Sequence, residues 1–126
     1  MLKNDFHGLQ HIGIPTLELT EAEKFWGKLG FTKIGDFPSG NVIFMEKDKL
    51  VIETWKLDEV AGAPGAINHI SLDVSDIDQA FIDAKAEGFA LIDKEIKFLP
   101  FWENGIKYFN VQGPEGIIVE FCEILK

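Results

Sequence analysis

Arginine is absent from this chain, and all twelve of its basic residues are lysine. An anionic substrate would therefore be held by lysine, by backbone N–H groups or by a metal, never by the two-pronged contact of a guanidinium group. Acidic residues outnumber basic ones by 21 to 12, which gives a formal net charge of −9. This excess of negative charge argues against nucleic acid and against an anionic membrane as partners.

Cysteine occurs once, as Cys122, so no disulfide can form within the chain. No apolar run approaches the length of a membrane span, and the first residues lack the apolar stretch of a secretory signal peptide. Together these absences lead us to expect a cytoplasmic protein. A hydrophobic content of 46% in 126 residues predicts one globular domain or two tightly fused halves.

What the chain does contain is an internal repeat. It has the heptapeptide GLQHIGI at residues 8–14 and a counterpart, AINHISL, 58 positions later at residues 66–72. A second match, offset by 67 positions, joins LVIE at residues 50–53 to IIVE at residues 117–120. Each half therefore carries one histidine near its beginning and one glutamate near its end, at equivalent places in apolar stretches.

Both halves predict the element order βαβββ. For the first half, we expect a strand at 8–15, a helix at 18–29 and strands at 31–37, 42–46 and 50–56. For the second half, we expect a strand at 66–74, a helix from an N-cap at Ser75-Asp76 to about 87, a long segment at 89–102, a hairpin turn at Asn104-Gly105 and strands at 106–112 and 117–123. Residues 58–65 read as a linker, so the prediction is one α+β domain over 1–126 with repeats at about 6–57 and 66–126.

The duplicated histidines and glutamates predict a metal site. Alternation places His11 and His69 on the strand face opposite the isoleucines, and Glu53 and Glu120 interrupt otherwise apolar strands. A buried lone carboxylate costs several kcal/mol unless it is paired, protonated or bound to a cation. Two imidazoles and two carboxylates suit Zn, Ni, Co, Mn or Fe(II) better than Ca or Mg. The alternative is that the histidines are hydrogen-bonded sheet residues and the glutamates surface groups, which the duplication disfavours.

Four other features could contribute to a functional site, but the sequence gives less evidence for them. His7 lies in the N-terminal tail without a counterpart, so we expect it to face solvent. Cys122 falls on the ligand face, as a pocket residue or as an inert buried thiol. Trp55 shares a face with Glu53 and could line the site or the core. The segment Phe98–Trp102 could form a pocket wall or lid, ordinary hairpin packing or a dimer contact.

These motifs resemble those of the vicinal oxygen chelate superfamily, which includes glyoxalase I, methylmalonyl-CoA epimerase, extradiol dioxygenases and the fosfomycin and bleomycin resistance proteins. The segments that carry the resemblance span nearly the whole chain: HIGI at 11–14, KLGF at 28–31, NHISLDV at 68–74 and GPEGIIVEF at 113–121. The resemblance implies two modules whose curved sheets form a cup, with helices on the convex side. It also implies one divalent metal, Ni, Co, Zn or Mn before Fe, held by His11, Glu53, His69 and Glu120.

This ligand order is most similar to bacterial glyoxalase I. The resemblance therefore implies a lyase or isomerase that acts on a 2-oxoaldehyde–thiol adduct through an enediolate, with Glu120 as the main base and Glu53 in a mirror role. Glyoxalase I commonly has an arginine for glutathione shortly after its first histidine ligand, where this chain has Pro15. This departure leaves the identity of the thiol open.

Three other activities known in this superfamily remain alternatives. They are metal-free binding of a drug or other ligand, Fe(II) extradiol dioxygenase activity and epimerase activity. In each case the partner is a small molecule. A homodimer is expected because module sheets leave edges that need a partner, and the metal site is completed by one chain or by two.

Overall fold

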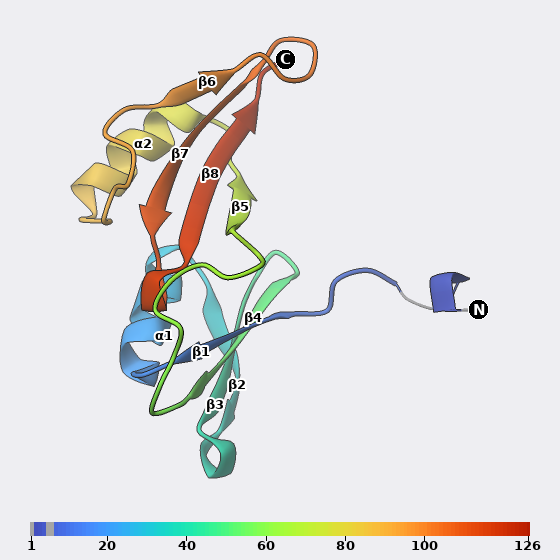
Figure 1. Ribbon diagram of the computed structural model, residues 1–126, viewed down its shortest axis with the longest axis vertical. Coiled ribbons are helices and arrows are strands. Elements are labelled where there is room, and N and C mark those ends of the chain that lie inside the picture. The colour runs from blue at the N-terminus through green and yellow to red at the C-terminus, as the bar shows by residue number, and fades with distance from the viewer. Residues whose placement is uncertain (1, 5–6) are drawn as a thin grey trace. The chain divides into compact units, whose positions relative to one another are not determined.

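The computed structural model describes residues 2–4 and 7–126 and divides the chain into two compact units, 1–60 and 61–126 (Figure 1). Each unit has one α-helix and a four-stranded mixed sheet, connected in the order βαβββ. The predicted α+β class with tandem modules is therefore confirmed. None of the helices in the described ranges has the length and apolar character needed to cross a membrane.

The first unit has the sheet order β1-β4-β3-β2, in which β1 runs parallel to β4. Its elements are η1 (Leu2–Asn4), β1 (Ile12–Thr16), α1 (Leu19–Lys28), β2 (Thr32–Phe37), η2 (Pro38–Gly40), β3 (Val42–Lys47) and β4 (Leu50–Lys56). The first strand begins four residues later than predicted, at Ile12 rather than residue 8, and includes Pro15. Proline is tolerated there because β1 is an edge strand.

The second unit repeats this topology as β5-β8-β7-β6, with β5 parallel to β8. Its elements are β5 (His69–Asp73), α2 (Ile77–Ala86), β6 (Lys97–Leu99), β7 (Ile106–Gln112), η3 (Pro114–Gly116) and β8 (Ile118–Ile124). The predicted two-residue hairpin turn at Asn104-Gly105 is wrong. Residues 100–105 form a longer loop between β6 and β7, in which Trp102 and Gly105 have φ values of 59° and 94°.

One face of each sheet is covered by its helix and holds the core. In the first unit α1 contacts β2, β3 and β4, and its Trp26 is buried with its ring 5.2 Å from that of Phe31. In the second unit α2 contacts β7 and β8, and Phe109 is fully buried against Phe81 and Phe121. Burial of large apolar side chains contributes about 1.5–3 kcal/mol each, so the helix-covered face of each sheet stabilises its unit.

The two parallel strand pairs share one register, which makes the sequence repeat a structural one. Ile12 faces Ile52 in β1 and β4, and Ile70 faces Val119 in β5 and β8. These partners are related by the sequence offsets of 58 and 67. Equivalent residues of the two units therefore have equivalent neighbours across their strands.

Candidate functional site

Each unit brings its histidine to its glutamate. In the first unit His11 Nε2 lies 3.3 Å from Glu53 Oε1. In the second unit His69 Nε2 lies 3.9 Å from Glu120 Oε2. The carboxylate side chains are only 27% and 16% exposed, respectively. The four residues predicted as metal ligands thus form two His–Glu pairs, one in each unit.

The parallel register explains why the pairs form. Glu53 faces Gly13 across β1 and β4, and Glu120 faces Ser71 across β5 and β8. Each histidine lies two residues before that glycine or serine, which places it on the same sheet face. Since the helix covers the other face, the histidine and glutamate side chains project away from the core.

An amide group fixes the orientation of each imidazole. His69 Nδ1 is 2.9 Å from the side-chain oxygen of Asn68, and His11 Nδ1 contacts the side-chain oxygen of Gln10. An amide oxygen only accepts hydrogen bonds, so these contacts favour the neutral tautomer whose Nδ1 carries the hydrogen. This tautomer has its lone pair on Nε2, the atom that faces the carboxylate.

This arrangement fits a divalent cation. In the tautomer that these contacts favour, a nitrogen lone pair and a carboxylate oxygen face one another in each pair, and two such acceptors repel unless a proton or a cation lies near both. An N–H donor behind a ligating histidine is also the usual support of metal sites. The described residues contain no group of three or more His, Cys, Asp or Glu that could hold a metal ion. The joining of both pairs in one four-ligand site therefore stays a prediction.

The two carboxylates have different surroundings. Ser71 Oγ donates a 2.6 Å hydrogen bond to Glu120 Oε2 and lies 3.1 Å from Cys122 Sγ. The corresponding position in the first unit is Gly13, and a Cβ atom there would lie 3.1 Å from the ring of Trp55. Glu120 is thus held by a hydroxyl group, whereas Glu53 lies beside an indole ring.

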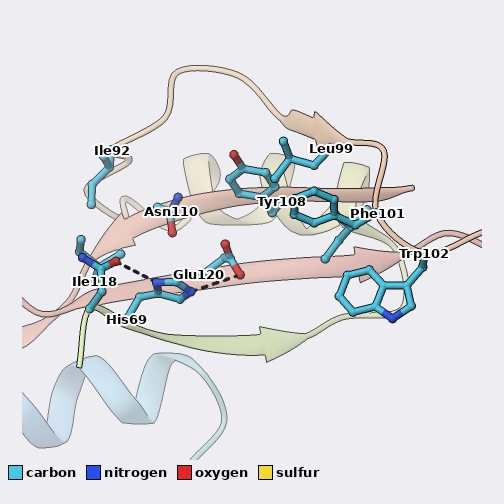
Figure 2. A pocket seen from close by; sticks show the side chains of 11 residues that line it. His69, Ile92, Leu99, Phe101, Trp102, Tyr108, Asn110, Ile118 and Glu120 are labelled. Carbon is cyan, nitrogen blue, oxygen red and sulfur yellow. Dashed lines mark hydrogen bonds and ion pairs between the residues drawn. The ribbon is translucent and has the colours of Figure 1, made fainter. Parts of the chain in front are cut away.

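A pocket of about 490 Å³ opens beside the pair of the second unit (Figure 2). Its polar residues are Asn68, His69, Tyr108, Asn110 and Glu120, and its apolar residues are Ile92, Leu99, Phe101, Trp102, Ile106 and Ile118. This volume is within the range of small-molecule sites. The segment Phe98–Trp102 contributes Leu99, Phe101 and Trp102 to the lining, so its interpretation as a pocket wall has structural support.

Several residues around the site were not assigned a role from the sequence. Gln10 and Asn68 belong to the repeated motif, and their position before each histidine was the signal available. Asn110 faces Glu120 across β7 and β8, and its amide donates to Asp93 Oδ2 at 2.9 Å. That pairing depends on the strand register, which the sequence does not encode locally. His7 is exposed, as expected for a tail residue.

Comparisons with known proteins agree with this architecture. A family model described as the Glyoxalase/Bleomycin resistance protein/Dioxygenase superfamily matches residues 10–108. A glyoxalase family protein from Enterococcus faecalis is similar in structure with a TM-score of 0.77 and 19% identity, over 94% of this chain and 98% of the other. Lactoylglutathione lyase from Agrobacterium tumefaciens is similar with a TM-score of 0.69 and 17% identity, over 92% of each chain.

One curated sequence also matches. The uncharacterized protein YwbC of Bacillus subtilis (strain 168) is 39% identical over 61 residues, which are 48% of this chain. The match spans 46% of that relative, less than half of its length.

Proposed function

Because the chain belongs to the Glyoxalase/Bleomycin resistance protein/Dioxygenase superfamily, we propose that it is a divalent-metal-dependent lyase or isomerase of the glyoxalase I type. Its substrate would be a 2-oxoaldehyde–thiol adduct or a similar molecule with two adjacent oxygens, converted through an enediolate. The observation that carries the proposal is the pair of register-equivalent His–Glu contacts, at 3.3 and 3.9 Å.

The metal would be held by His11 and Glu53 from a first unit and by His69 and Glu120 from a second unit, of the same chain or of the partner in a homodimer. This nitrogen and oxygen donor set suits Ni, Co, Zn or Mn. A bound metal supplies Lewis-acid stabilisation of the negative charge that develops on the substrate oxygens. The side-chain oxygens of Gln10 and Asn68 keep the Nε2 lone pairs directed toward the ligand positions.

The proton transfer would be performed by Glu120. One carboxylate oxygen, Oε2, accepts the hydrogen bond from Ser71, and the other would take the proton from the carbon next to the carbonyl. The same carboxyl group would return that proton to the neighbouring carbon, so the substrate is isomerised without loss of atoms. Glu53 would have the mirror role on the opposite side of the substrate.

The test is the metal content of purified, tag-free protein, measured by elemental mass spectrometry for wild type, Glu120→Ala and the control Glu103→Ala. Glu103 is exposed in the loop between β6 and β7. We expect about one equivalent of metal per site in wild type and the control, and a loss in Glu120→Ala. Glu120→Gln should abolish turnover of 2-oxoaldehyde–thiol adducts. Absence of metal after reconstitution, or full activity in Glu120→Gln, would contradict the proposal.

A second candidate is a metal-free binding protein. It is favoured by the aromatic side chains of Phe101 and Trp102 in the pocket, since aromatic surface alone can retain an apolar ligand. This function predicts that no stoichiometric metal is found, and that ligand affinity is the same in wild type and in His11→Ala, since His11 does not line this pocket.

A further inference from the structure

We infer that the pocket of the second unit selects substrates with a neutral aromatic or bulky apolar group beside the two adjacent oxygens, and discriminates against an anionic thiol such as glutathione. The inference rests on the proposed function, because it names the substrate class of that site. Its basis is the distribution of polar, apolar and charged groups around the pocket.

The pocket has a polar part and an apolar part. Figure 2 shows His69 and Glu120 lying together, with Phe101 and Trp102 displaced from them toward the loop between β6 and β7. A ligand whose oxygens lie at Glu120 would therefore extend its substituent toward these rings. Aromatic and aliphatic side chains bind apolar surface without a requirement for fixed polar partners.

The charge of the wall is unsuited to an anionic substituent. Glu120 is the carboxylate among the described lining residues, and lysine does not occur among them. Three lysines lie within two residues of a lining residue in the sequence. Lys97 Nζ lies 4.0 Å from Glu95 Oε1, Lys107 Nζ lies 3.6 Å from Asp78 Oδ2, and Lys94 is exposed and does not line the pocket. A metal at the polar part would attract the two substrate oxygens. It would not provide a positive group at the aromatic part, where the carboxylates of a thiol such as glutathione would lie.

Trp102 is the residue whose conformation points most directly to a ligand. Its side chain is 64% exposed, and its φ of 59° lies in the left-handed region that bulky residues seldom adopt. A bulky residue in this backbone conformation is strained, and strained residues cluster at functional sites. Phe101 lies edge-on at a centroid distance of 6.3 Å, which leaves one face of the indole available to stack on a ring.

Three small amides test this assignment. Mandelamide has a phenyl ring beside adjacent hydroxyl and carbonyl oxygens and carries no charge. Lactamide has the same oxygens with a methyl group in place of the ring, and 4-carboxymandelamide has the same oxygens and ring with a negative charge at the far end of the ring. Binding is followed in the full chain, freed of metal, by the NMR shifts of the three indole N–H groups. The Trp102 signal is identified by its disappearance in Trp102→Phe.

We expect mandelamide to bind at least tenfold more tightly than lactamide, because burying a phenyl ring removes much apolar surface from water. Mandelamide should also bind more tightly than 4-carboxymandelamide and should shift the Trp102 signal. Trp102→Ala should weaken mandelamide about threefold to tenfold, and Trp102→Phe should retain most of the affinity. Phe37→Ala is the matched control, since Phe37 is 54% exposed in the first unit, outside the pocket.

The inference is wrong if lactamide and mandelamide bind equally, if 4-carboxymandelamide binds as tightly as mandelamide, or if Trp102→Ala binds mandelamide like wild type. A change of the monomer–dimer state in Trp102→Ala, with unchanged mandelamide affinity, would instead assign Trp102 to an interface and would also overturn it. Repeating the titrations with metal separates the two proposals. If mandelamide binds more tightly than the other two compounds and metal does not change these affinities, the pocket assignment is supported and the proposed metal-dependent function is contradicted.

Discussion

Ser71 Oγ donates a 2.6 Å hydrogen bond to Glu120 Oε2, a contact that the repeat-equivalent pair of Gly13 and Glu53 cannot make. In the first unit the space beside the carboxylate is occupied by the ring of Trp55. Two glutamates that the duplication makes equivalent in register are thus different in chemistry. A charged hydrogen bond is stronger than a neutral one and fixes geometry, so Glu120 is the more firmly oriented carboxylate.

Ser71→Ala should weaken metal binding at the proposed site by about tenfold, because hydrogen bonds to charged groups contribute about 1.5–3 kcal/mol. The measurement is competition with a colorimetric chelator. Ser75→Ala, the same substitution at an exposed residue outside the site, is the control and should behave as wild type. Equal affinity in Ser71→Ala and wild type would show that the hydroxyl does not position the carboxylate.

Gln10→Ala and Asn68→Ala should each lower metal affinity by about tenfold to a hundredfold, the usual effect of removing the hydrogen-bond partner of a ligating histidine. Gln10→Ala removes the oxygen that accepts from His11 Nδ1, and Asn68→Ala removes the one that accepts from His69 Nδ1. Two-dimensional NMR of the imidazole nitrogens should show a mixture of tautomers in the variants. Retention of a single tautomer together with wild-type affinity would contradict this account.

Thr54→Val should stabilise the protein by about 1 kcal/mol. Thr54 Oγ1 is buried without a hydrogen-bond partner within the described part of the chain, and valine has nearly the same shape without the cost of burying a hydroxyl. Thr16→Val is the contrasting variant: Thr16 is also buried, but its hydroxyl accepts a 3.1 Å hydrogen bond from the backbone N–H of Glu18. Urea denaturation should show that Thr16→Val lowers the free energy of unfolding by about 1–3 kcal/mol. Equal changes in the free energy of unfolding for Thr54→Val and Thr16→Val would contradict the view that only the Thr16 hydroxyl has a hydrogen-bond partner.

Gly105→Ala should destabilise the second unit by about 1–3 kcal/mol, because a φ of 94° suits only glycine and a Cβ atom would collide with the ring of Phe98. Gly27→Ala is the matched control, because Gly27 lies in α1 with open space around it. Alanine should stabilise this helix by about 0.5–1 kcal/mol. Thermal unfolding measures both changes, and a neutral Gly105→Ala would argue against the loop conformation.

Removal of the proposed metal should lower thermal stability. A ligand at one hundred times its dissociation constant stabilises the folded state by about 2.7 kcal/mol, which corresponds to several degrees in Tm for a chain of this length. Calorimetry of chelator-treated protein, with and without added nickel or zinc, provides the comparison. The stabilisation should disappear in a His69→Ala variant; if it persists, the metal binds elsewhere.

The sequence was most informative where a strand has partners on both sides. The predicted limits of β4 and β7, at 50–56 and 106–112, agree with the structure. Both are inner strands, so their apolar pattern reflects burial along their whole length. By contrast, β1 starts at Ile12, and Leu9, which was predicted to lie in this strand, is 72% exposed before it. The alternation of apolar and polar residues predicts which sheet face each side chain of residues 8–16 occupies. It does not show at which residue pairing with β4 begins.

The candidate site could be predicted to the level of residue pairs. Repeated segments adopt the same strand register. The sequence offsets of 58 and 67 residues therefore predict that His11 pairs with Glu53 and that His69 pairs with Glu120. The contacts of Ser71 and Asn110 with β8 residues were not, because they depend on side-chain conformations and on antiparallel pairing. The conformation of residues 89–105 was also inaccessible, since only three residues of this segment lie in β6 and the segment is longer than its counterpart in the first half.

The placement of that segment has a consequence for how such a protein can diversify. Its strand β6 pairs with β7 alone, whereas His69 and Glu120 lie on β5 and β8. Residues 90–93 pair with β7, and Asp93 binds Asn110 opposite Glu120, so these residues belong to the scaffold of the site. Residues can be inserted, deleted or exchanged between positions 94 and 104 without altering the register of the two strands that hold the histidine and the carboxylate, so a loop transplanted there from a homologue is a route to new specificity.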